Sequence, residues 1–184
     1  MRQSKQLLQK IFSKEELNHQ LKRWQLLGKK IVFTNGVFDI LHKGHIQILS
    51  EAATFADVLI VGVNADASVK RLKGNSRPIN AEASRALILA ALLMIDAVII
   101  FEEDTPLELI KFIKPNVLVK GGDYTLETIV GAKEVLENNG EVKIIPLEEG
   151  FSTTGIIKSI GNRQWKKKKK NIQHLVINVQ CSIK

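Results

Sequence analysis

The run Val58-Leu59-Ile60-Val61-Gly62-Val63 contains no polar side chain. A strand of this kind is buried on both faces, as in parallel sheets that are covered by helices. Similar strand-like runs cover residues 30–33, 97–101, 117–119 and 142–145, and helical stretches lie between them at residues 81–94, 106–113 and 128–138. Thr105 is the expected N-cap of the second stretch, with Pro106 as its first residue. This alternation predicts an α/β fold, a doubly wound parallel sheet of about five strands.

The segment before the first strand has a helical pattern. Its apolar residues recur along one helical face between Ser4 and Gly28. Ser13 is a suitable N-cap with Glu16 three residues later, and Gly28 is a suitable stop. We expect one or two amphipathic helices, an N-terminal helical extension over residues 1–29. It packs on the domain or on a second subunit, and a partner-binding helix is the alternative.

Two histidines and two glycines stand where the first strand gives way to a helix. A helix that starts near Gly44 points its first N–H groups and its positive dipole end toward the end of the strand, which suits an anion. Gly36 and Gly44 leave the backbone room to approach a ligand. His42 and His45 are three residues apart, so they lie on one side of the first turn and reach one ligand together. We therefore predict a phosphate site.

Two other interpretations of these histidines remain: a solvated pair, or half of a metal site. Zinc needs three or four clustered ligands, and only His19, His174 and Cys181 remain as further nitrogen or sulfur ligands, all far away in the sequence. We expect no metal site built from side chains.

The segment Gly36-Val37-Phe38-Asp39-Ile40-Leu41-His42-Lys43-Gly44-His45 resembles the signature of the cytidylyltransferase-like nucleotidyltransferases, a Rossmann-like superfamily. Residues 61–69, 72–74, 77–80, 117–124 and 149–154 are similar to its D-glycero-β-D-manno-heptose 1-phosphate adenylyltransferases, and the resemblance runs from about Lys30 to Gly161. It implies transfer of AMP from ATP to heptose 1-phosphate, which gives ADP-heptose and pyrophosphate for lipopolysaccharide core biosynthesis. The alternative is a glycerol-3-phosphate cytidylyltransferase or another transferase of the superfamily. The acidic stretch Leu147-Glu148-Glu149 replaces a basic residue of the cytidylyltransferases and favours the heptose branch.

The resemblance also implies roles for individual residues. His42 and His45 are the expected catalytic residues. The expected nucleotide-binding residues are Gly36, Val37, Phe38, His42, Gly44, His45, Gly121, Asp123, Ser152, Thr153 and Thr154. The expected substrate-binding residues are Asp39, Asn64, Asp66, Lys73, Arg85 and Lys120. Mg²⁺ is expected to arrive with ATP.

Several of these residues have a structural alternative. The alternative for Lys73 is an ordinary exposed lysine, and the alternative for Arg85 is a structural ion pair. The alternative for residues 120–123 is a tight turn without a ligand, and the alternative for residues 152–154 is a plain helix cap. Asp39 orients a substrate hydroxyl or helps to hold Mg²⁺. The site is expected beyond the carboxyl ends of the strands, where doubly wound sheets bind ligands.

The net charge of +8 comes from the end of the chain. Residues 163–184 contain seven Lys and Arg and no Asp or Glu, which leaves 20 cations and 19 anions in the remainder. We expect a nucleotidyltransferase domain over residues 30–161 and a basic, disordered tail over residues 162–184. Contact with an anionic membrane or a nucleic acid is the functional alternative, and a slipped reading frame is a third. A basic nucleic-acid-binding protein is disfavoured because its cations would cover the folded face.

The cysteine count and the lengths of the apolar runs indicate the cellular compartment. One cysteine, no signal peptide and no apolar run near 18 residues favour a cytoplasmic protein without membrane contact. The expected partners are ATP, a sugar 1-phosphate and a second copy of the chain in a homodimer. A separate sugar kinase is also expected, since no kinase domain fits before Lys30.

Overall fold

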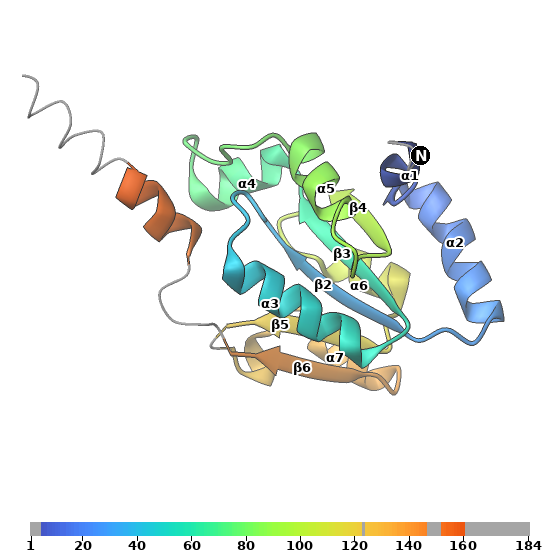
Figure 1. Ribbon diagram of the computed structural model, residues 1–184. Coiled ribbons are helices and arrows are strands. Elements are labelled where there is room, and N and C mark those ends of the chain that lie inside the picture. Colours follow the sequence, from blue (N-terminus) through green and yellow to red (C-terminus); the bar gives the residue numbers. More distant parts are fainter. Residues whose placement is uncertain (1–4, 123, 147–151, 161–184) are drawn as a thin grey trace, which may run out of the picture. The chain divides into compact units, whose positions relative to one another are not determined.

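The computed structural model describes residues 5–122, 124–146 and 152–160. The chain divides into two units, residues 1–148 and 149–184, and each is described by itself. The first unit contains a parallel sheet with the strand order β1-β4-β3-β2-β5-β6 (Figure 1). The strands are β1 (Ile11–Phe12), β2 (Ile31–Gly36), β3 (Val58–Asn64), β4 (Ala97–Phe101), β5 (Val117–Gly121) and β6 (Glu141–Ile145).

Helices separate the strands along the chain. They are α1 (Lys5–Leu8), α2 (Lys14–Leu26), α3 (Lys43–Ala52), α4 (Asp66–Lys73), α5 (Glu82–Ala90), α6 (Leu107–Ile113) and α7 (Ala132–Glu137), with 3₁₀ turns at Ala53–Phe55 and Leu126–Thr128. In the second unit, residues 153–160 are helical. Among the described residues, no helix is both long and apolar enough to cross a membrane.

The predicted doubly wound sheet is confirmed. After β2 the chain builds outward through β3 and β4, and it then returns to the other side of β2 to form β5 and β6. The direction of winding therefore reverses between β2 and β5. In an open parallel sheet, the carboxyl ends of the strands at such a reversal form the crevice that receives ligands.

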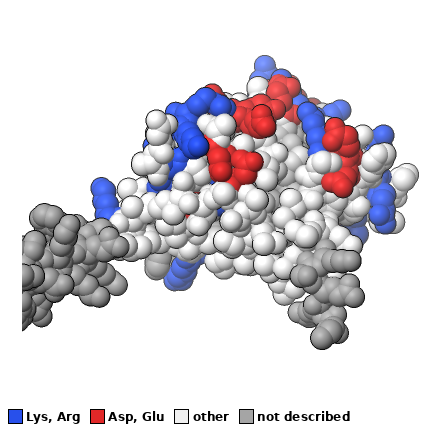
Figure 2. Space-filling view, turned by 90° about the horizontal axis from the view of Figure 1, so that it is seen from above, with Lys and Arg blue, Asp and Glu red and all other residues white. Residues whose placement is uncertain are grey.

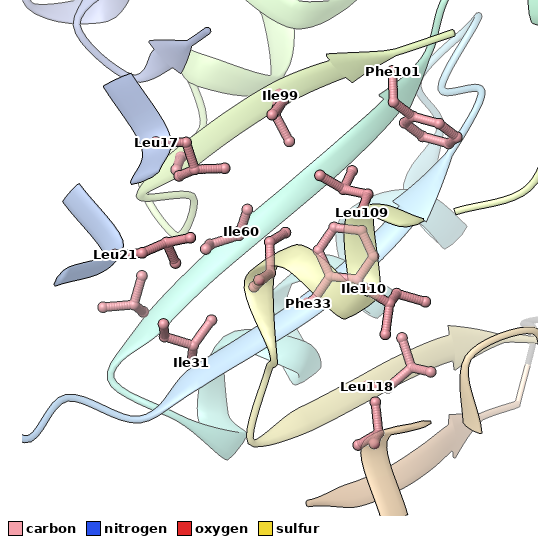
Figure 3. Packing of buried hydrophobic residues seen from close by; sticks show 14 of the residues in the cluster. Leu17, Leu21, Ile31, Phe33, Ile60, Ile99, Phe101, Leu109, Ile110 and Leu118 are labelled. Carbon is pink, nitrogen blue, oxygen red and sulfur yellow. The ribbon is translucent and has the colours of Figure 1, made fainter. Parts of the chain in front are cut away.

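The core has one layer on each face of the sheet. On one face, α2, α6 and α7 pack against strand residues that include Phe33, Ile60 and Leu118 (Figure 3). On the other face, α3 and α5 pack against alternate residues of the same strands, including Val32 and Val61. This two-sided burial explains why β3 has no polar residue before Asn64, and the whole strand is buried.

Helix α2 begins after Ser13, as predicted. Ser13 is its N-cap: the Ser13 hydroxyl accepts from the Glu16 N–H, and the Glu16 carboxylate accepts from the Ser13 N–H. Leu17 and Leu21 are buried in the core of the sheet. This segment therefore packs on the domain within the chain, and residues 5–28 contribute to its core.

Other details differ from the prediction. The sheet has six strands because Ile11 and Phe12, expected to be helical, pair in parallel with β4. A two-residue strand is too short to show an alternating pattern. Helix α4 was not predicted, because only Ser68 and Val69 of its eight residues are buried and no apolar stripe marks it.

Two helix starts are also displaced from the prediction. The N-cap of α6 is Pro106, one residue after the expected Thr105. Helix α7 begins at Ala132, after a 3₁₀ turn in the stretch expected to be helical from residue 128. Helix ends are the least certain part of a pattern-based prediction because termini fray and mix with 3₁₀ turns. The predicted tail, residues 162–184, lies outside the described residues.

We predict that Leu17→Ala lowers the free energy of unfolding by about 3 kcal/mol, because it leaves a cavity beneath α2. Leu17 is 0% exposed and Leu26, on the same helix, is 87% exposed. Leu26→Ala is therefore the control, with an expected change within about 0.5 kcal/mol. Urea denaturation of both variants measures the difference. Equal losses would show that α2 does not belong to the cooperative core.

Candidate functional site

The two histidines lie where β2 passes into α3, as predicted. His42 is the N-cap of α3, and its carbonyl oxygen accepts from the N–H groups of His45 and Ile46 at 2.9 and 3.3 Å. The imidazole rings of His42 and His45 stack with centroids 3.8 Å apart and planes 29° apart. The phenyl ring of Phe38 lies 5.3 Å from the ring of His45. One helix start thus presents two stacked imidazoles beside its amino-terminal N–H groups.

Each of the stacked rings has a nitrogen that needs a partner. Nδ1 of His42 and Nδ1 of His45 are buried and have no hydrogen-bond partner among the described residues. Leaving a buried polar atom without a partner costs about 1–3 kcal/mol. Such atoms in a folded protein call for a functional explanation. A ligand with phosphate oxygens at this helix start would supply acceptors for protonated ring nitrogens.

Burial keeps both imidazoles neutral at pH 7. Desolvation lowers the pKa of His42. Desolvation, and then repulsion by His42 and by Lys73, lowers the pKa of His45 from 6.5 to about 4. The histidines were predicted to form a phosphate site. In the ligand-free protein they are placed to give hydrogen bonds, since the charged form is disfavoured.

The backbone before the histidines is tightly constrained. Phe38 has a φ of +48°, a left-handed conformation that is rare for a bulky residue. A Cβ on Gly36 would lie 3.1 Å from the Phe38 ring, so the glycine permits this close fold. Gly44, in the first turn of α3, is buried. The conformation of the loop is thus held by packing rather than by the preferences of its residues.

Asp39 fastens this loop to the segment between α4 and α5. It is 2% exposed. Its carboxylate accepts from Arg77 Nε at 2.6 Å and from the N–H groups of Ile79 and Asn80, each at 2.8 Å. Burial alone would raise the pKa of Asp39, but the N–H groups of Asn80 and Ile79 and the Arg77 guanidinium lower it overall. In this structure the carboxylate therefore holds the loop, and its predicted contact with a substrate hydroxyl or Mg²⁺ stays a prediction.

Arg85, on α5, makes a second set of bonds that hold the histidine loop. Its side chain is fully buried and donates to the carbonyl oxygens of Asn80 and Val37 at 2.9 and 2.6 Å. A third bond, 2.7 Å long, joins it to Asp66, whose N–H in turn donates to Glu82. The structure thus shows the alternative of a structural ion pair for Arg85 and Asp66. All of these bonds join residues of the same chain.

A half-buried lysine lies at the reversal of the sheet. Lys120, near the end of β5, donates from its ammonium group to Oδ1 of Asn35 on β2. Burial lowers the pKa of Lys120 to about 8, so the group is mostly cationic at pH 7 and incompletely solvated. A cation at the carboxyl ends of β2 and β5 is suited to a phosphate ligand. Asn35 was not among the predicted site residues, although a polar residue that ends an apolar strand was a usable signal.

Gly121 brings α3 close to the sheet. A Cβ at this position would lie 2.2 Å from Cδ1 and 2.9 Å from Cγ1 of Ile48, a residue of α3. The glycine predicted to contact the nucleotide thus also permits the close approach of Ile48, on the helix that carries His45.

The other predicted residues of the first unit differ in how exposed they are. Asn64 is buried and donates to the Ser68 hydroxyl at 3.2 Å. Lys73, at the end of α4, is exposed, and its charge acts on His45. Asp123 lies outside the described residues.

The segment 152–154 belongs to the second unit, which is described by itself. The Ser152 hydroxyl accepts from the Gly155 N–H at 3.0 Å, as an N-cap does. Within residues 5–122, 124–146 and 152–160, no group of three His, Cys, Asp or Glu side chains is placed to hold a metal ion.

Comparison with known proteins agrees with this geometry. Residues 33–177 match the protein family described as Cytidylyltransferase-like. The bifunctional protein HldE of Campylobacter jejuni subsp. jejuni serotype O:2 is 57% identical over 155 residues, 84% of this chain and 32% of the relative. HldE of Nitrobacter hamburgensis is 54% identical over 151 residues, 82% of this chain and 31% of the relative. The chain thus spans about a third of the length of these curated relatives.

A solved structure shares the fold. The lipopolysaccharide core biosynthesis protein from Thermoplasma volcanium GSS1 superimposes with a TM-score of 0.53 at 31% sequence identity. The match covers 66% of this chain and 98% of that chain.

We predict that Asp39→Asn lowers the free energy of unfolding by about 3 kcal/mol, because it leaves the Arg77 guanidinium without its buried partner. The double variant Asp39→Asn/Arg77→Met should lose less than the sum of the two single variants, since both remove one interaction. Asp57→Asn is the control: the exposed Asp57 also accepts from a backbone N–H and pairs with a lysine. Urea denaturation measures all four, and strict additivity would contradict the observed pairing.

A second prediction concerns pH. Between pH 6.5 and about 4 the unfolded chain binds a proton at His45 that the folded protein does not bind, so the free energy of unfolding falls as the pH falls through this range. His45→Asn should flatten this dependence. His19→Asn, which changes an exposed histidine on α2, should leave it as in the wild type. Equal slopes for wild type and His45→Asn in denaturation between pH 7 and 4.5 would refute the burial of a neutral imidazole.

Proposed function

Because this chain belongs to the cytidylyltransferase-like family, we propose that it transfers AMP from ATP to D-glycero-β-D-manno-heptose 1-phosphate and releases ADP-heptose and pyrophosphate. The observation that carries the proposal is the stacked pair His42 and His45 at the start of α3, with two buried nitrogens that lack partners. The heptose assignment rests on the similarity of residues 61–69, 72–74, 77–80 and 117–124 to the heptose 1-phosphate adenylyltransferases. The role of one relative in lipopolysaccharide core biosynthesis is consistent with it.

The reaction needs alignment and charge stabilisation more than a strong base. A phosphate oxygen of the sugar 1-phosphate is an anion at pH 7 and attacks the α-phosphorus of ATP. The new P–O bond forms as the bond to the β-phosphate oxygen breaks, and the electron pair leaves with pyrophosphate. Negative charge grows on the leaving group and persists on the equatorial oxygens of the α-phosphorus. Hydrogen-bond donors already aimed at those oxygens stabilise the transition state without reorganisation.

The described residues divide these tasks. His42 and His45 donate hydrogen bonds to triphosphate oxygens at the helix start, in line with the positive end of the α3 dipole. A bound polyphosphate raises the pKa of His45 from about 4, so a proton taken up on binding would add charge where the leaving group departs. Lys120 and the exposed Lys73 provide cations at two edges of the same region. Asp39 and Arg85 hold the loop that carries the histidines.

Mg²⁺ is proposed to accompany ATP as part of the substrate. The described carboxylates do not fit a protein-held ion, because Asp39 is occupied by Arg77, Ile79 and Asn80 and no three ligating side chains gather. The nucleotide contacts of Gly121, Asp123 and residues 152–154 stay predictions. So do the cytoplasmic location, the homodimer and a separate sugar kinase.

We predict that His42→Asn and His45→Asn each lower the rate of pyrophosphate release about 100-fold or more, because each removes a donor aimed at the transferred phosphate. The assay uses ATP, Mg²⁺ and heptose 1-phosphate. His19→Asn should keep the wild-type rate, and circular dichroism should be the same for all three variants. A near-normal rate in either site variant would overturn the catalytic assignment.

The same assay tests the substrates. ATP with heptose 1-phosphate should exceed CTP with glycerol 3-phosphate by about 10⁴-fold in kcat/KM, because polar groups fitted to a sugar lose their partners when glycerol binds. Equal efficiency for the two pairs would refute the heptose assignment and leave only the chemistry of the family.

A further inference from the structure

Asn35 and Lys120 are neighbours across the sheet at the point where its winding reverses. Strands β2 and β5 pair in parallel with Phe33 opposite Leu118, and the same register places Asn35 opposite Lys120. Residues two apart in a strand point to the same side, so both polar side chains lie on the face covered by α6 and α7. Across this pair the Lys120 ammonium donates to the amide oxygen of Asn35.

A glycine on the next strand leaves the space that Asn35 occupies. Gly62 lies opposite Asn35 on β3. A Cβ on Gly62 would lie 3.2 Å from Cβ of Asn35, 3.2 Å from Cδ2 of Leu109 and 2.9 Å from Cζ of Phe33. A larger residue at this position would therefore displace its neighbours. Packing between β3, β5 and α6 thus fixes the amide that accepts from the lysine.

The ammonium group of Lys120 has no carboxylate beside it. None of the ion pairs among the described residues includes Lys120. Exposed cations elsewhere do lie beside carboxylates, as Lys29 lies beside Asp57 and Arg71 beside Asp104. Figure 2 shows blue and red side chains next to one another on one face of the molecule. Lys120 is therefore a half-buried cation whose charge is not compensated within the described part of the chain.

A neutral acceptor suits a lysine whose charge is needed by a ligand. A carboxylate at position 35 would cancel the field of the ammonium, and an apolar residue would leave the group without its acceptor and favour its neutral form. An amide oxygen accepts one N–H and adds no charge. On the other side of Lys120, β6 places the apolar Ile144. Burial is the one cause that shifts the pKa of Lys120, to about 8, so no charged group of the described residues acts on it.

We propose that Asn35 is a positioning residue of the nucleotidyltransferase site: its amide holds the Lys120 ammonium at the carboxyl ends of β2 and β5 without neutralising it, so the whole charge acts on the phosphate groups of the ligand. The inference rests on the proposed function in placing phosphates at this edge of the sheet. His42 and His45 come from α3, which packs on the other face. Phosphates bound at the strand ends would thus meet donors from both faces.

The first test needs no substrate. The full chain is isotope-labelled at lysine Cε, the Lys120 signal is assigned by its loss in Lys120→Met, and its pKa is measured by NMR titration. Asn35→Asp should raise the pKa of Lys120 by about one unit or more, because it adds a counter-charge, and Asn35→Leu should lower it, because it removes the acceptor. The control for added charge is Asn139→Asp, an exposed residue just before β6, at the amino end of the sheet.

Asn139→Asp should leave the pKa of Lys120 as in the wild type. An unchanged pKa in both Asn35 variants, or a shift in the same direction in both, would contradict the proposed contact. Circular dichroism of every variant should match the wild type. Asn35→Asp keeps the shape of the side chain, so it retains the test if Asn35→Leu disturbs the fold.

The second test measures the binding of pyrophosphate, a product that nucleotidyltransferases share, by titration calorimetry at pH 7. The carboxylate of Asn35→Asp also repels pyrophosphate directly, so the decisive variants are uncharged. Lys120→Met should weaken binding about tenfold or more, and Asn35→Leu should weaken it in the same direction. Because Asn35 acts through Lys120, Asn35→Leu/Lys120→Met should bind no more weakly than Lys120→Met alone.

Additive losses in the double variant, or wild-type affinity in Asn35→Leu, would overturn the positioning role. A wild type that binds no pyrophosphate would refute the phosphate site and this inference with it. The two tests also separate the inference from the proposed substrate. A chain that shows both effects but does not turn over heptose 1-phosphate would keep the role of Asn35 and lose the heptose assignment.

Discussion

Two arginines and their aspartate partners hold the histidine loop in place. Arg77 pairs with Asp39 inside the loop, and Arg85 reaches the carbonyl of Val37 at its start. The loop contains a strained Phe38 and ends in the N-cap of α3. Local preferences do not favour that conformation, so it depends on partners from α4, α5 and the segment between them. Removing a partner would leave a buried charge, which makes this arrangement more rigid than a surface loop.

The bonds that hold the histidine loop also affect the protonation of the histidines in the candidate site. The same packing that fixes the loop buries the Nδ1 atoms of His42 and His45 and disfavours their protonation. A low local dielectric would also strengthen every hydrogen bond that the rings give to the proposed phosphate ligand. Lys120 experiences a related environment between β2 and β5. The site therefore combines neutral donors with a partly desolvated cation, a suitable composition for stabilising charge on a polyphosphate.

Sequence reasoning predicted that the two histidines lie together, but it did not find the contacts that Asp39 makes within the chain. The stacked histidines were predicted from the strand, the glycines and the helix start. Asp39 was predicted to orient a substrate hydroxyl or to help hold Mg²⁺, and the resemblance implied an anion-binding role for Arg85, with a structural ion pair as the alternative. In the structure Asp39 pairs with Arg77 and Arg85 donates to the Val37 carbonyl, across separations of 38 and 48 residues, and the predicted substrate contacts stay predictions. Asn35, next to Lys120, was missed because its role depends on a neighbouring strand from later in the chain.

The sequence by itself determined the strands β2 to β6, the doubly wound class of fold and the capping box of α2, because these depend on the periodicity of burial and on hydrogen bonds within a few residues. The tertiary structure decided the rest. It made Ile11 and Phe12 a sheet edge, it directed Arg85 inward, and it brought Asn35 beside Lys120. Each of these depends on which distant segments meet. A local pattern records that a side chain is polar or apolar, but the partner that satisfies it is chosen only when the sheet assembles.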